Sequence, residues 1–265
     1  MSAVSISIRT VNVTRYVTPL REGGSLPAIV EGDDLGTYVL KFRGAGQGPK
    51  VLVAELLVGE LARYLDLPAP EVVFADVDPV LARSEPDSEI KELIAASAGL
   101  NLALDYLPGS FAYDPAAGPQ PDALLASGIV WLDALVTNVD RTVRNTNMIV
   151  WHKRIWLIDN GASLYVHFGA PDYVARAGNP FPQIRNHVLL RRATMLREVD
   201  DLFSARLAGD LVDHLVGLIP DTWLEDPAFS GPAAQREAYV DYLWKRLEPP
   251  RAFVDEALDA HAQLV

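Results

Sequence analysis

The sequence has 265 residues, of which 49% are hydrophobic, a net charge of −12 and no cysteine. This length and composition allow a substantial hydrophobic core, in one bilobal domain or in two small ones. The negative charge argues against a nucleic-acid-binding protein, because phosphate backbones are bound by clustered lysine and arginine. The lack of cysteine excludes disulfide bonds and thiolate metal sites.

The first predicted strands form a hairpin. Residues 26–30 and 37–42 have the composition of β-strands and flank a turn rich in glycine and aspartate. Because side chains alternate along a strand, Lys41 lies on the face opposite to Leu40 and Phe42. Taken alone, this lysine could be an edge-strand residue that discourages aggregation, or a cation that binds phosphate groups.

A strongly helical segment, residues 51–65, follows the glycine-rich connection 44–48. This connection lacks the Gly-Lys-Ser/Thr of a Walker loop and the third glycine of a dinucleotide-binding loop, so we interpret it as a flexible link. On the helix, Glu55 and Glu60 interrupt the apolar residues and either could pair with Lys41. They are about 140° apart around the helix, so they cannot both face the lysine.

Further along the chain, residues 71–77 and 100–107 predict two more strands, and residues 78–87, rich in proline and acidic residues, predict a loop. From Asp122, apolar residues recur at helical spacing and predict an amphipathic helix. The sequence after residue 183 is mostly helical, with breaks near its prolines. These elements predict an α+β protein whose C-terminal part is mainly helical.

Three oxygen-bearing side chains surround the next predicted hairpin. Two apolar runs, residues 148–151 and 155–158, read as its strands, while Asp140 and Asn145 precede it and Asp159 follows it. In an antiparallel pair, Asn145 and Asp159 arrive at the same end. Oxygen ligands suit a hard cation such as Mg²⁺, which prefers one or two carboxylates plus phosphate oxygens.

The spacing of these residues indicates a specific chemistry. An aspartate followed five residues later by an asparagine, and then a hairpin ending in Asp-x-Gly, is the arrangement that kinases use for a catalytic base and two metal ligands. Each residue alone is more often a turn residue. Their combination around one hairpin favours a kinase.

These segments resemble the HipA-like kinases, specifically a short branch of that family. The resemblance implies a bilobal protein-kinase-like fold, distantly similar to phosphatidylinositol kinases. It places an N-lobe of antiparallel sheet plus helix in residues 1–107, ending in a hinge, and a mostly helical C-lobe in residues 108–265. The segments that carry the resemblance are residues 23–27, 39–48, 55–70, 104–108 and 137–162.

The resemblance also implies a role for each candidate residue, with ATP bound between the lobes and Mg²⁺ at its phosphates. The implied nucleotide-binding residues are Lys41, Gly23, Gly24, Ser25 and the hinge residues Asp105, Tyr106 and Leu107. Of the implied catalytic residues, Asp140 is the base and Lys41 contacts the α and β phosphates. Glu55, ahead of Glu60, is the implied partner of Lys41. Asn145 and Asp159 are the implied ligands of Mg²⁺.

The chain departs from the family pattern in several places. Residues 23–25, Gly-Gly-Ser, stand where the familiar HipA toxins have their phosphate-covering loop. Asn160 occupies the middle of the Asp-x-Gly motif, where a phenylalanine is usual, and Asn138 stands where protein kinases place a histidine. The chain is also much shorter than the known toxins. Toxin activity and an antitoxin partner are therefore not assumed.

Three functions remain open from the sequence. The resemblance favours a serine/threonine protein kinase, a small-molecule kinase of the same fold is the second candidate, and a catalytically silent nucleotide-binding scaffold is the third. The expected partners are ATP and a hydroxyl-bearing acceptor, with no nucleic acid and no membrane. The sequence shows no signal-peptide pattern and no apolar run of spanning length, which predicts a soluble, cytoplasmic protein.

Overall fold

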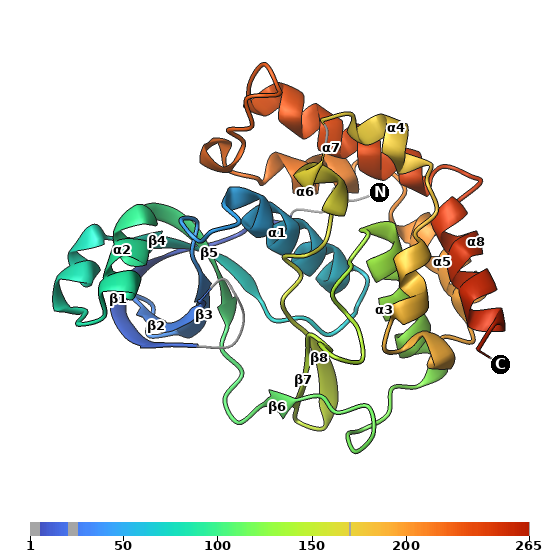
Figure 1. The fold of residues 1–265 in the computed structure, drawn as a ribbon, viewed down its shortest axis with the longest axis horizontal. Helices are drawn as coiled ribbons and strands as arrows, with labels where there is room; N and C mark the ends of the chain where they lie inside the picture. Colours follow the sequence, from blue (N-terminus) through green and yellow to red (C-terminus); the bar gives the residue numbers. More distant parts are fainter. Residues whose placement is uncertain (1–5, 21–25, 170, 265) are drawn as a thin grey trace.

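The computed structural model describes residues 6–20, 26–169 and 171–264. Figure 1 shows two parts of different secondary structure: a small β-barrel, the N-lobe, with helix α2 (Ser88–Ala96) beside it, and a mostly helical C-lobe. Helix α1 (Pro49–Tyr64) lies between them. The predicted α+β, bilobal fold is confirmed, while the boundary at residue 107 stays a prediction.

The sheet of the N-lobe closes on itself. Its strands are β1 (Thr10–Pro19), β2 (Ala28–Gly32), β3 (Thr37–Lys41), β4 (Val72–Val77) and β5 (Gly99–Asp105). The strand order is β1-β2-β3-β5-β4, and a parallel pair of β1 with β4 completes a barrel whose other pairs are antiparallel. The sequence did not predict β1, because its buried residues are confined to Val11 and Val13 and register shifts interrupt its pairing.

Strand β3 has the alternation that its sequence predicts. Tyr38 and Leu40 are buried among the side chains inside the barrel. Val39 packs instead against the core that the barrel shares with α1 and the C-lobe, and Lys41 is 5% exposed. The strand therefore delivers a lysine to the space between the lobes while its other face holds the barrel together.

Helix α1 is buried along most of its length, from Val51 to Ala62. It packs against β4, β5 and α6 (Leu211–Gly217), so it contacts both lobes. Its mainly apolar sequence suits a helix covered on all sides rather than an amphipathic surface helix. Glu55 and Glu60 are the charged residues of this buried stretch, and they need partners in the protein.

Helix α3 (Ala123–Leu135) leads to the predicted catalytic loop. The sequence predicted an amphipathic helix, and this was wrong, because every residue from Ala126 to Leu135 is buried. Helices α5 (Leu196–Arg206), α7 (Pro232–Leu247) and α8 (Ala252–Ala262) all pack against it. The other C-lobe helices are α4 (Tyr173–Ala177), α6 and the short 3₁₀ helices η2 (Tyr165–Phe168), η3 (Pro182–Asn186), η4 (Leu190–Arg192) and η5 (Asp221–Trp223).

The C-terminal end of α3 is held by a buried arginine of α7. Arg246, 2% exposed, donates from Nε to Leu135 O at 2.6 Å and from Nη2 to Ala134 O at 2.8 Å. These carbonyl groups belong to the last turn of α3 and lack partners within the helix. Arg246 thus fixes the point at which the chain leaves α3 for the predicted catalytic loop.

The predicted hairpin is present as β7 (Met148–Trp151) and β8 (Arg154–Leu157), with a short third strand, β6 (Phe111–Ala112), on the free side of β7. Its turn consists of two residues with φ of 47° and 63°, a geometry that matches the twist of paired strands. Arg154, expected in the turn, pairs with Trp151 instead. Across the described residues, no helix is both long and apolar enough to cross a bilayer.

Candidate active site

A lysine and two carboxylates meet between the lobes. Lys41 Nζ on β3 lies 3.0 Å from Glu55 Oε1 on α1 and donates a 2.6 Å hydrogen bond to Oδ1 of Asp159, which follows β8. The Lys41 and Glu55 side chains are 6% and 0% exposed, whereas that of Asp159 is 46% exposed. Three elements distant in sequence therefore build one charged cluster with a single open side, at Asp159.

The two carboxylates of this cluster differ in acidity. Burial raises the pKa of Glu55, and Lys41 opposes this shift. For Asp159 burial acts in the same direction, but the charge and hydrogen bond of Lys41 outweigh it and the pKa is lowered. Burial alone would lower the pKa of Lys41, yet Glu55 and Asp159 together raise it. Asp159, on the open side, is therefore the more readily ionised of the two carboxylates.

The sequence left open whether Glu55 or Glu60 faces Lys41. Glu60 lies 3.6 Å from Arg63, one turn further along α1, and Glu55 makes the contact with the lysine. This follows from the angle between the two glutamates, since α1 presents only one of them to β3.

Asp140 is held by two side-chain amides. Its Oδ2 accepts hydrogen bonds from Asn145 Nδ2 at 2.8 Å and from Asn147 Nδ2 at 3.1 Å. A carboxylate only accepts, so both amides must direct their nitrogen atoms to Asp140, and the Asn145 oxygen points elsewhere. Asn147 was not predicted as a site residue, although its place directly before the predicted strand was visible in the sequence. The structure shows it as a left-handed turn residue, with a φ of 46°.

A buried polar network lies beneath this loop. Arg141, 1% exposed, donates from Nε to Asp133 Oδ2 at 2.6 Å and from Nη1 to the Asn147 carbonyl oxygen. Asp133 also accepts from Asn138 Nδ2 at 3.0 Å and lies 2.9 Å from His187 Nε2. This network was not predicted from the sequence, because charged residues within an apolar helix or a loop are ordinarily interpreted as surface residues.

Asn160 connects the two halves of the site. Its Oδ1 accepts a 2.7 Å hydrogen bond from Arg141 Nη2, and its backbone N–H donates to Glu55 Oε2 at 3.0 Å. The side chain at the position where the kinase pattern has phenylalanine therefore ties the turn at Asp159 to Arg141 of the predicted catalytic loop, while the backbone ties the turn to α1. The departure from the family pattern thus has a structural reason in this chain.

Gly161 lets α1 approach the turn. A Cβ at this position would lie 2.5 Å from Val51 Cγ1, well inside van der Waals contact. We expect Gly161→Ala to push α1 away from the turn and to lengthen the Lys41–Glu55 contact. The variant should fold with a lowered melting temperature, by roughly 2–8 °C for a 1–2 kcal/mol overpacking cost. Calorimetry checks this, with Gly178→Ala, where a Cβ meets open space, as control. Equal melting temperatures for the two variants would contradict it.

The family of the chain follows from its match to a protein-family sequence model. The model described as "HipA-like kinase" matches residues 13–248, which is most of the chain. The chain belongs to the HipA-like kinase family. It is therefore a member of a kinase family, as its sequence predicted. No curated protein sequence matches the chain.

Solved structures of kinases are similar to this HipA-like kinase. The Helicobacter pylori proinflammatory kinase CtkA is similar with a TM-score of 0.54 and 12% identity, over 97% of this chain and 99% of that one. A Golgi casein kinase determined with Mn/ADP bound is similar with a TM-score of 0.47 and 13% identity, over 92% of this chain and 75% of the other. At these identities, the similarity to CtkA establishes the fold alone.

The expected hinge of this HipA-like kinase lies at the end of β5. The amides of Asp105 and Tyr106 donate to Glu71 O at 2.9 Å and to Thr37 O at 3.0 Å, so both are occupied by the barrel. Within the described part of the chain, the Leu107 amide has no protein acceptor. Of these three amides, that of Leu107 is the one the barrel does not occupy, and the binding of the nucleotide by Asp105, Tyr106 and Leu107 stays a prediction.

The oxygen atoms at the open side fit a hard cation. Among the described residues, the Asn145 side-chain oxygen has no hydrogen-bond partner, since its nitrogen is directed to Asp140, and the Asp159 carboxylate is half exposed at the same end of the hairpin. No cluster of three or more histidine and acidic side chains that could hold a metal is present in the described part of the chain. Mg²⁺ is held by few protein ligands together with phosphates, and its binding here stays a prediction. The expected contacts of Gly23, Gly24 and Ser25 lie outside the described residues.

Proposed function

We propose that this HipA-like kinase transfers the γ-phosphate of ATP, with Mg²⁺, to the hydroxyl group of a serine or threonine in a protein. The observation that carries the proposal is the meeting of Lys41, Glu55 and Asp159 beside a loop in which Asn145 orients Asp140. Such catalysis consists mainly of positioning the reactants and neutralising charge, which is what this cluster can supply.

In the proposed reaction, each residue has one task. Lys41, oriented by Glu55, binds the α and β phosphates, and the Leu107 amide binds the adenine edge. Asn145 and Asp159 would hold Mg²⁺, which when bound would neutralise phosphate charge. Asp140 accepts the proton of the acceptor hydroxyl group while the oxygen of that hydroxyl group forms a bond to the γ-phosphorus. The bond from that phosphorus to the β–γ bridging oxygen breaks, and ADP leaves.

A titration with ATP and Mg²⁺ tests the nucleotide and metal assignment. At about 100 times its Kd, bound nucleotide should stabilise the wild type by about 2.7 kcal/mol, which corresponds to roughly 5–10 °C in melting temperature. Asp159→Asn should lose the part of this shift that depends on Mg²⁺. Asp66→Asn, at a largely exposed aspartate paired with Arg206, should keep it.

Labelled ATP then identifies the acceptor. Transfer of label to protein supports a protein kinase, transfer to metabolites alone indicates a small-molecule kinase, and a nucleotide shift without any transfer indicates a silent scaffold. A wild type that shows no shift with ATP and Mg²⁺ would contradict the nucleotide site itself.

A further inference from the structure

Lys50, on the first turn of α1, occupies a position that helix chemistry disfavours. The N-terminal end of a helix carries partial positive charge, so an acidic residue is favoured there and a lysine is not. The residue preceding the helix, Gly48, has a φ of 68° and supplies no side-chain cap. Local helix preferences therefore do not explain Lys50, and its role has to come from tertiary contacts.

Lys50 makes two contacts with the C-lobe. Its Nζ donates a 2.6 Å hydrogen bond to the His167 carbonyl oxygen in η2 and lies 2.7 Å from Asp226 Oδ2. The Lys50 and Asp226 side chains are 26% and 15% exposed, so water screens the pair less than a surface ion pair. The hydrogen bond from Lys50 is the main cause that lowers the pKa of Asp226, which keeps that carboxylate charged.

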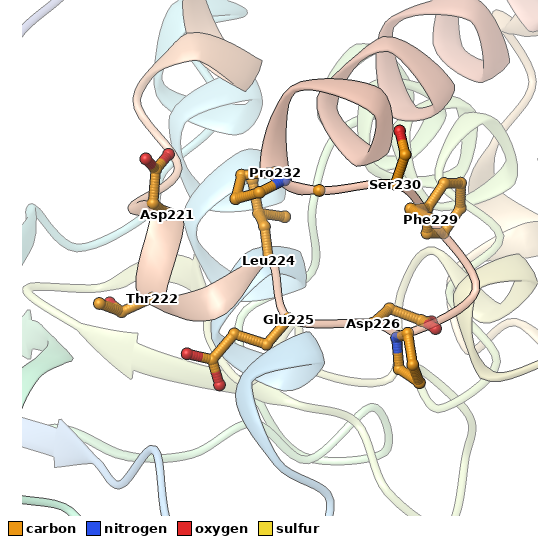
Figure 2. A pocket seen from close by; sticks show the side chains of 10 residues that line it. Asp221, Thr222, Leu224, Glu225, Asp226, Phe229, Ser230 and Pro232 are labelled. Atoms are coloured by element: carbon orange, nitrogen blue, oxygen red, sulfur yellow. The ribbon is translucent and has the colours of Figure 1, made fainter.

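The partners of Lys50 are themselves held in place. His167 is 0% exposed, and its Nδ1 lies 3.0 Å from the Tyr239 hydroxyl of α7. Burial lowers the pKa of His167 to about 3, so its ring is neutral beside the lysine. Figure 2 shows Asp226 on the loop that leads into α7, where it borders an open cavity of about 400 Å³. Lys50 therefore binds α1 to two separate C-lobe segments.

The same segment of α1 makes a line of contacts with the chain after Asp159. Glu55 accepts from the Asn160 amide, Val51 limits the space at Gly161, and Lys50 binds the carbonyl of His167. Lys50 and Glu55 are five residues apart, about 7.5 Å along the helix axis. A shift of α1 at Lys50 is thus carried directly to the glutamate that orients Lys41.

We propose that Lys50 is a positioning residue that, through Asp226 and the His167 carbonyl, keeps α1 in the arrangement in which Glu55 holds Lys41. The proposal rests on the proposed kinase function, and it assigns to the loop before α7 an influence on the rate of phosphoryl transfer. Loss of the two Lys50 contacts, together called the clamp, changes how Lys41 is oriented and leaves the hinge contact with adenine in place. The effect should fall on kcat rather than on the KM for ATP.

Kinetics of four variants and one control variant test this assignment. Lys50→Met and Asp226→Asn should each lower kcat roughly 10- to 100-fold with the KM for ATP within about twofold, as expected for a small misplacement of a catalytic group. The double variant should be no slower than Lys50→Met alone, because Lys50→Met already removes the ion pair through which Asp226 acts. Lys50→Arg should restore part of the rate. Lys245→Met, which removes an exposed lysine paired with Glu248, is the matched control.

Hydrogen exchange supplies a reading that does not depend on activity. The α1 amides should exchange faster in Lys50→Met and Asp226→Asn than in the wild type and in Lys245→Met, since local opening follows the loss of tertiary contacts. If both clamp variants match the control in kcat and in α1 exchange, the assignment is wrong. If the wild type transfers no phosphate, the proposed function fails separately, and unchanged α1 exchange then overturns the clamp as well.

Discussion

Replacement of Asp140 by asparagine is expected to lower the rate of phosphoryl transfer by about 10²- to 10⁴-fold, the range typical for loss of a general base. The amide that replaces the carboxylate cannot accept the hydroxyl proton. Nucleotide binding should persist, because Lys41, Asp159 and the hinge are unchanged. Initial rates with labelled ATP and the melting temperature with ATP and Mg²⁺ measure the two effects on the same protein.

The control for this variant is the same substitution at an aspartate away from the site. Asp241 lies on the exposed side of α7, and Asp241→Asn should keep the wild-type rate. An Asp140→Asn protein as fast as that control would show that Asp140 is not the base. A variant that loses the nucleotide-dependent shift along with activity would instead assign Asp140 to nucleotide binding.

Replacement of Arg141 by methionine is expected to lower the free energy of unfolding by about 3–5 kcal/mol, the usual cost of removing one partner of a buried ion pair. Asp133, which is 0% exposed, would lose its principal counter-charge, and the acceptors on Asn147 and Asn160 would lose their donor. Urea denaturation followed by circular dichroism measures this difference. Arg185→Met, which removes an exposed arginine, should change stability little.

The stability difference between wild type and Arg141→Met should also depend on pH. Burial raises the pKa of Asp133, but Arg141 and His187 outweigh it, so the pKa is lowered in the wild type. The wild type therefore keeps this stabilisation above the unfolded-state pKa of about 3.9 and loses it as the pH falls through the lower folded-state value. In the variant, Arg141 no longer opposes the effect of burial, so the pKa of Asp133 should rise. Protonation in acid then removes the unpaired negative charge of Asp133.

The difference between the two proteins should consequently be largest near neutral pH and should narrow as the pH falls toward 4. Adding Asp133→Asn to Arg141→Met should recover part of the lost stability at neutral pH, because it removes the unpaired charge. A difference that stays constant between pH 7 and pH 4 would show that Asp133 is not the group responsible.

Local patterns in the sequence were enough for the elements that carry the candidate site. Alternation of side chains placed Lys41 on the face of β3 opposite to the barrel interior, and the paired apolar runs predicted the hairpin that brings Asp159 to the same end as Asn145. These features depend on neighbours within a few residues, and the strand period and the turn express them directly. The family pattern has the same local character, since its spacing lies within one loop and one hairpin.

Other features required the tertiary structure because they join residues that are far apart in the chain. The closure of the barrel depends on the parallel pairing of β1 with β4. The choice of Glu55 over Glu60 and the contact of Lys50 with Asp226 depend on how α1 packs between the lobes. The network of Asp133, Arg141 and Asn160 remained hidden for a further reason. A buried charge looks like a surface charge in sequence, and only the packed fold shows which partner offsets its loss of water.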